Sequence, residues 1–261
     1  MAPTSLFRRA ALLLFAGSAV LSPVVSADTF DVPLKKKVVD LGPSPYVRRS
    51  RIQLSCYFYR TFVIMQHDEG QKGAEWLAIV PIQNGVAPKC IQPHDQGERI
   101  IEANEWGGYF KGVKENLVFF DAADGNDGGI PFAVYDSSTG KKLFEDSAYQ
   151  TKIRGEEMRG KKVVDAPFDE LRVNKTSNGR LSLKYLRVVE ADCDLYNEKA
   201  GCWKKVRNKL GLRNTQAPVC SDYEGKPAPW ESAIVYRVEV FLFPLPSTKA
   251  LAGPVNCWPV D

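Results

Sequence analysis

The chain has 261 residues, with 35 Lys and Arg against 31 Asp and Glu, and its formal net charge is +4. Nucleic-acid binding needs clustered basic side chains, so this nearly balanced composition argues against a nucleic-acid partner. The length allows one large domain or two small ones.

Residues 1–27 have the pattern of an export signal. Arg8 and Arg9 precede an apolar run, and Val25-Ser26-Ala27 supplies the cleavage positions before Asp28. The apolar run is shorter than the roughly 20 residues that a membrane-spanning helix needs. We therefore expect cleavage of residues 1–27, no membrane span afterwards, and a secreted or periplasmic protein.

The six cysteines all follow the expected cleavage site. An even number of cysteines in an exported chain indicates disulfides, because these bonds persist in an oxidising compartment. The chain lacks a C-x-x-C pair and has two histidines, so zinc coordination is not indicated. Many connectivities are open, and proximity favours the pairs Cys56 with Cys90, Cys193 with Cys202, and Cys220 with Cys257. The last two pairs would fasten an insertion at about 193–230.

The first half of the mature chain is expected to be extended. An irregular, proline-spaced segment at 28–45 leads into a single β-rich domain over 46–261. Residues 51–66 are rich in aromatic and β-branched side chains, which favours a half-buried strand. The polar stretch 67–73 ends this run and 75–82 resumes it, which predicts a hairpin.

Short strands are also expected at 108–113 and 117–121. Residues 131–136 and 141–146 alternate polar and apolar side chains around the turn sequence DSSTG, which predicts the clearest hairpin in the chain. Taken alone, FAVYDSSTGKKLFEDS resembles the outer hairpin of a β-propeller blade. A second copy does not recur at a blade-like period of about 40 residues, so a complete propeller is not predicted.

The second half continues the pattern, with strands expected at 161–166, 169–175, 179–191 and 232–243. Between the last two strands, Trp203, Val206 and Leu210 recur at helical spacing, which predicts one short helix over 201–212. The proline-rich tail at 244–261 is expected to be irregular.

These elements predict the fold class. Each antiparallel strand must bury one face against another layer. We expect an all-β, mainly antiparallel protein: a β-sandwich or partly closed barrel with at most one short helix, stabilised by disulfides.

The stretch FFDAADGNDGG at 119–129 is the first candidate site. Calcium binds six to eight oxygens, and Asp121, Asp124, Asn126 and Asp127 offer several from one loop. The spacing departs from the regular calcium-loop pattern, and the same residue types form plain turns between strands. A third interpretation makes these carboxylates the acid and base of a hydrolase. Calcium is the one cofactor that the sequence suggests.

Aromatic residues near glycine form the second candidate site. Trp106 adjoins Gly107 and Gly108, which would leave room around its ring, and Tyr109 follows. Exposed rings of this kind can stack on carbohydrate or contact a protein ligand. The alternative is that both rings pack in the core.

The two histidines are a third candidate. His67 and His94 each precede acids in polar surroundings, so they would form a metal site if their loops met. The alternative is that both are ordinary surface histidines.

The sequence contains no G-x-S-x-G nucleophile motif, P-loop or dinucleotide fingerprint. We therefore expect an exported binding or envelope-associated module without catalytic activity. The alternative is a hydrolase that acts on extracellular or envelope polymers through the carboxylates at 121–127.

Overall fold

A computed structural model describes residues 30–91, 97–125, 128–149, 152–153, 156–157, 171–196, 198–220 and 232–260. The expected signal at 1–27 and the expected strand at 161–166 lie outside these ranges. Across the described residues the chain is mostly antiparallel β-structure with one helix, and its sheets do not close into a barrel. The expected fold class is confirmed, because strands dominate and three disulfides join them.

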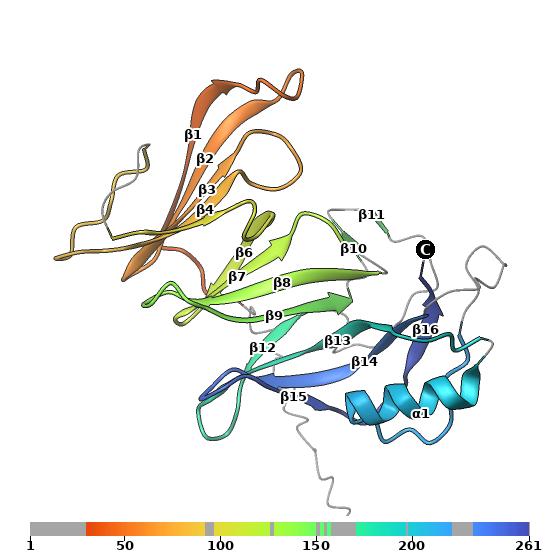
Figure 1. The fold of residues 1–261 in the computed structure, drawn as a ribbon. Coiled ribbons are helices and arrows are strands. Elements are labelled where there is room, and N and C mark those ends of the chain that lie inside the picture. Colours follow the sequence, from red (N-terminus) through yellow and green to blue (C-terminus); the bar gives the residue numbers. More distant parts are fainter. Residues whose placement is uncertain are drawn as a thin grey trace, which may run out of the picture.

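The first sheet of the described chain is a five-stranded antiparallel meander in chain order (Figure 1). Its strands are β1 (Lys35–Pro43), β2 (Arg51–Phe58), β3 (Phe62–Asp68), β4 (Trp76–Pro81) and β5 (Arg99–Glu102). The run at 51–66 is therefore two strands, joined by a turn in which the Tyr59 N–H donates to the Phe62 carbonyl at 2.9 Å. This turn has no Gly, Pro, Asn or Asp, so the usual turn signal was missing.

Strand β1 replaces part of the irregular segment expected at 28–45. It forms an edge of the first sheet and pairs with β2 along its length, with one register shift between Asp40 and Gly42. Lys35, Lys36 and Lys37 lie on this exposed edge, where lysines discourage pairing with another chain.

The second sheet has nine strands among the described residues, in the order β15-β14-β13-β9-β8-β7-β6, with β12 beside β13 and β16 beside β14. The strands are β6 (Gly108–Lys114), β7 (Leu117–Ala122), β8 (Gly129–Asp136), β9 (Lys142–Tyr149), β12 (Arg172–Lys175), β13 (Leu181–Ala191), β14 (Ser232–Phe241), β15 (Ser247–Ala250) and β16 (Asn256–Pro259). Strands β10 (Lys152–Ile153) and β11 (Glu156–Glu157) form a separate pair. The expected hairpin at 131–146 is confirmed as β8–β9.

The second sheet divides at the β9–β13 junction. In the described chain, these strands pair through Arg187 and Ala148, whereas β13 and β14 pair along ten residues. Beyond the junction the two halves face each other, and the rings of Phe132 on β8 and Tyr185 on β13 meet edge to face at 5.2 Å. One large core cluster fills the space between the halves.

Strand β7 shows how the layers are stacked. Leu117 and Phe119 join the core between the halves of the second sheet, whereas Val118 and Phe120 face the first sheet. All four side chains are fully buried, because alternate residues of a strand point to opposite faces and both faces of β7 are covered. The first sheet therefore packs on the β6–β8 region of the second.

The single described helix, α1 (Lys199–Leu210), lies close to the range expected at 201–212. It ends at Gly211, whose φ of 66° is the left-handed conformation that glycine adopts readily at a helix C-terminus. Trp203 and Val206 bury the inner face of the helix against the sheet. In the described part of the chain, no helix combines the length and apolar character of a membrane span.

The tail at 244–261 is more regular than expected, because β15 and β16 both pair with β14. Pro244, Pro246 and Pro254 precede or separate these strands, so they do not remove ladder hydrogen bonds. All six cysteines are described and paired as expected: Cys56 with Cys90, Cys193 with Cys202, and Cys220 with Cys257.

Candidate functional site

The two described aspartates of the 119–129 stretch, Asp121 and Asp124, are each paired with a lysine. Asp121 lies at the end of β7, and its Oδ2 accepts a hydrogen bond from the Lys111 Nζ at 2.5 Å. Asp124 forms an ion pair with Lys72. Asn126 and Asp127 lie outside the described residues, and within those residues no cluster of three His, Cys, Asp or Glu is arranged to hold a metal ion. A calcium site or an acid–base pair here stays a prediction that the described geometry does not support.

Trp106 is a core residue and not an exposed ring. It is 7% exposed and packs between the two sheets. Gly108 leaves space for the Trp106 ring, as expected, but the ring itself fills this space. A Cβ at Gly108 would lie 2.6 Å from the indole Nε1. The Tyr109 hydroxyl accepts from the Gly73 N–H at 2.8 Å and donates to the Gln71 carbonyl at 3.3 Å. Trp106 therefore lacks the exposed setting that the binding hypothesis assumed, whereas Tyr109 is half-buried and its role in binding stays a prediction.

His67 is also buried, although its polar neighbours suggested a surface position. It lies on β3, is 7% exposed, and stacks on Trp76 with ring centroids 5.2 Å apart. His94 lies outside the described residues, so the two-histidine metal site remains untested.

The structure instead contains a pocket between α1 and β13, with a volume of about 460 Å³. Eleven residues line it: Arg187, Val189, Glu190, Ala191, Asp192, Cys193, Lys205, Val206, Lys209, Leu210 and Ile234. Pockets of about 300–1,000 Å³ with mainly apolar walls and a few polar groups are typical of small-molecule sites.

The walls of the pocket follow from the periodicities of its two elements. On β13, residues two apart share a face, so Val189 and Ala191 both point toward the core beneath α1. On α1, residues four apart share a face, so Val206 and Leu210 form an apolar row, beside which Lys205 and Lys209 form a basic row. The result is an apolar interior with charged groups around it.

A polar cluster lies at the Arg187 side of the pocket. The Arg187 Nε donates to Asp146 Oδ1 at 2.8 Å, and the Tyr185 hydroxyl donates to Asp146 Oδ2 at 2.5 Å. The Ser147 N–H also donates to Asp146 Oδ1, at 2.9 Å, and the Arg187 Nη1 donates to the Tyr236 hydroxyl at 3.4 Å. The Asp146 side chain is 5% exposed, so its charge depends on these partners.

The environment of this cluster fixes its protonation. Burial, and then the charge of Asp146, raise the pKa of Tyr185 well above its usual value. Burial also raises the pKa of Tyr236, although Arg187 opposes this effect. Burial alone would lower the pKa of Arg187, but the charge of Asp146 and the interactions with Tyr236 together outweigh burial, and the pKa is raised. At neutral pH the two phenols are therefore neutral, and they lie beside the Arg187–Asp146 ion pair.

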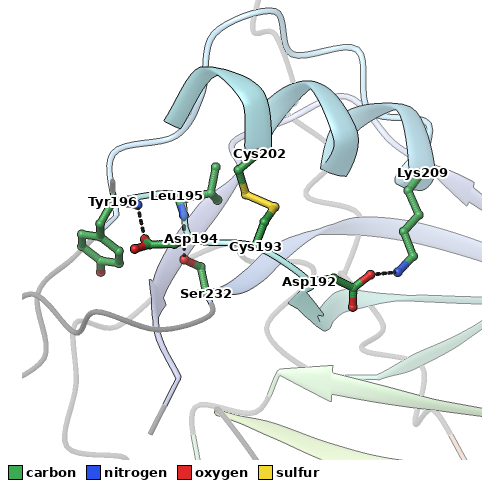
Figure 2. Close-up of a disulfide and its surroundings, with 8 residues drawn as sticks. All are labelled: Asp192, Cys193, Asp194, Leu195, Tyr196, Cys202, Lys209 and Ser232. Atoms are coloured by element: carbon green, nitrogen blue, oxygen red, sulfur yellow. Dashed lines mark hydrogen bonds and ion pairs between the residues drawn. A yellow bond between two sulfur atoms is a disulfide. The ribbon is translucent and has the colours of Figure 1, made fainter. Parts of the chain in front are cut away.

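Two links hold α1 over the pocket (Figure 2). The Cys193–Cys202 disulfide joins the end of β13 to the first half of the helix. Near the other end, Lys209 Nζ lies 2.6 Å from Asp192 Oδ2. The chain between β13 and α1 is tied to β14, because the Leu195 N–H donates to the Ser232 hydroxyl at 3.3 Å. The pocket walls are thus fastened by covalent and polar contacts.

The sequence carries one indication of this pocket, the insertion fastened by Cys193 and Cys202. Asp146, Arg187 and Lys205 have no local motif, because they meet only when β9, β13 and α1 come together. Comparison of the chain with protein-family models, curated proteins and solved structures finds no match.

Proposed function

We propose that this chain is an exported, non-enzymatic binding module whose ligand is a small molecule held in the pocket between α1 and β13. The observation that carries the proposal is the pocket itself: about 460 Å³, largely apolar inside, with a few charged groups around it.

Two further features support a binding role. The pocket lining contains no serine, threonine or histidine, and its cysteine is held in a disulfide, so it offers no hydroxyl or thiol nucleophile and no histidine base. The walls are fastened by the disulfide, to which the exposed Lys209–Asp192 ion pair adds a weaker link. A fastened site loses less conformational entropy when a ligand binds.

Export is supported by the leader pattern at 1–27 and by the three disulfides, which suit an oxidising compartment. A role in the cell envelope or outside the cell follows from that location.

The test uses a pocket-filling variant and a matched control. Val189 lines the pocket and is half-buried, so Val189→Phe adds bulk there. Val38→Phe makes the same change at an exposed position on strand β1, which does not line the pocket. Both proteins and the wild type are screened by thermal shift against a panel of anionic, cationic and neutral small aromatic and aliphatic compounds.

Compounds that raise the melting temperature of the wild type and of Val38→Phe, but not of Val189→Phe, support the pocket as the binding site. Stabilisation that persists in Val189→Phe would place binding elsewhere and overturn the proposal. A hydrolytic activity on envelope polymers that disappears in an Asp121→Ala and Asp124→Ala double variant of unchanged stability would overturn the non-enzymatic role.

A further inference from the structure

We propose that the pocket selects a small organic acid, a molecule with an apolar body and one carboxylate that Arg187 and Lys205 hold. This inference rests on the proposed function, because it specifies the ligand of the same pocket.

Arg187 supplies an oriented set of donors. A guanidinium has five N–H groups. One donates to Asp146 and one to Tyr236, and the others have no acceptor among the described residues. The side chain is 26% exposed and lines the pocket. The contacts with Asp146 and Tyr236 fix the plane of the guanidinium, and a planar fork of N–H groups matches a carboxylate in a bidentate geometry.

Lys205 supplies the positive charge. Arg187 is already neutralised by Asp146, so this ion pair offers donors but little net charge. Lys209 is likewise paired with Asp192, and Glu190 already interacts with another residue. Lys205 is exposed at the pocket and forms no ion pair with any described residue. An anion in the pocket would therefore gain from the charge of Lys205.

The apolar walls of the pocket favour an apolar body for the part of the ligand beyond its carboxylate. Val189, Ala191, Val206, Leu210 and Ile234 line the interior and offer no hydrogen bonds from their side chains. A sugar or an inorganic anion would lose hydration there without replacement, which costs free energy for every unpaired polar group. An apolar body instead gains from burial against these side chains.

Isothermal titration calorimetry with the full, disulfide-bonded protein tests the charge preference. The two probes are naphthalene-2-carboxylate and naphthalene-2-carboxamide, which share the apolar body and differ in charge. We expect the carboxylate to bind about tenfold more tightly, which corresponds to about 1.4 kcal/mol. Equal or tighter binding of the carboxamide would overturn this inference but leave the pocket as a binding site. If neither probe binds, the carboxylate inference is also overturned. The proposed binding function is tested separately, by the thermal-shift panel with the wild type and Val189→Phe.

Neighbouring lysines on α1 give a matched pair of variants. Lys204 and Lys205 are both exposed, but only Lys205 lines the pocket. Lys205→Gln should weaken carboxylate binding about fivefold, within the range of an exposed charge pair, and Lys204→Gln should leave it unchanged. Equal effects of both substitutions, or none from Lys205→Gln, would overturn the role of Lys205.

Arg187→Lys tests the guanidinium without leaving Asp146 unpaired. It keeps a positive charge beside Asp146 but removes the planar fork, so carboxylate affinity should fall about tenfold while carboxamide affinity changes little. A variant that loses affinity for both probes equally would show a structural effect and overturn the role of Arg187 in carboxylate recognition.

Discussion

Asp146 and Arg187 form a partly buried ion pair, with 2.8 Å between Oδ1 and Nε, at the junction of the two halves of the second sheet. Arg187 is the described residue of β13 that pairs with β9, and Asp146 lies two residues before its partner Ala148. The same ion pair therefore links the sheet halves and orients the guanidinium at the pocket.

Asp146→Asn should destabilise the protein by about 3 kcal/mol, because it leaves Arg187 largely buried without its counter-charge. Urea denaturation of both proteins measures the difference. Asp192→Asn is the control, since the Asp192–Lys209 ion pair is exposed and its loss should change stability little. An Asp146→Asn protein as stable as the wild type would contradict the linking role.

Gly108→Ala and Gly201→Ala should have opposite effects on stability. A Cβ at Gly108 would overlap the Asp121 carbonyl and the Trp106 indole, so we expect a loss of about 2 kcal/mol or more. A Cβ at Gly201 on α1 meets no atom within 4 Å. Alanine there should stabilise the helix by about 0.5–1 kcal/mol. Thermal unfolding checks both, and a tolerated Gly108→Ala would contradict the close packing of Trp106.

The disulfides should differ in their contribution to stability. Cys56 and Cys90 are 34 residues apart, whereas Cys193 and Cys202 are 9 apart. Restricting the unfolded chain should contribute about 4 kcal/mol for the longer loop and about 3 kcal/mol for the shorter one. Paired Cys→Ala variants, compared by chemical denaturation, measure these values.

The Cys193–Cys202 disulfide, which closes the shorter loop, should contribute more to ligand binding in the pocket. It anchors α1, whereas Cys56–Cys90 lies on the first sheet and away from the pocket lining. Removing the Cys193–Cys202 disulfide should therefore lower the affinity of a pocket ligand more than removing the Cys56–Cys90 disulfide. The reverse order would contradict the anchoring role of the Cys193–Cys202 bond.

Asp136 should make the stability of the β8–β9 hairpin pH-dependent. Burial raises its pKa, but hydrogen bonds from Ser138 and Thr139 to its Oδ1 outweigh burial and lower the pKa below its usual value. A carboxyl with a lowered folded-state pKa contributes stability above its unfolded pKa of about 3.9 and loses that contribution as the pH falls through its folded pKa.

The stability gap between the wild type and Asp136→Ala should therefore be constant from about pH 5 to pH 7 and shrink below about pH 4. Denaturant titrations across this range measure the gap. A gap that stays the same down to pH 2 would show that ionised Asp136 does not hold the turn.

Calcium should leave the melting temperature unchanged. Lys111 and Lys72 neutralise Asp121 and Asp124, which a calcium ion would need as ligands. Thermal unfolding with added calcium and with chelator tests this expectation. A calcium-dependent rise would show that the loop binds the ion, since a ligand of the native state must stabilise it.

Features with a local cause were predictable from the sequence. The β8–β9 hairpin follows from alternating side chains around DSSTG, and α1 follows from helical spacing that ends at Gly211. The disulfide pairs join cysteines that are close in the sequence, so proximity identified them. In each case the residues that cause the structure lie within or beside it.

Features with a distant cause were not predictable. Trp106 looks accessible beside Gly107 and Gly108, but the first sheet covers it. Strands β15 and β16 share the edge of β14 that β13 leaves free, which their own proline-spaced sequence does not reveal. The pocket and its Asp146–Arg187 ion pair combine β9, β13 and α1, and no periodicity encodes which strand will border which helix. Local chemistry thus accounts for the separate strands and turns of this protein, whereas long-range packing between them creates the site that we propose binds its ligand.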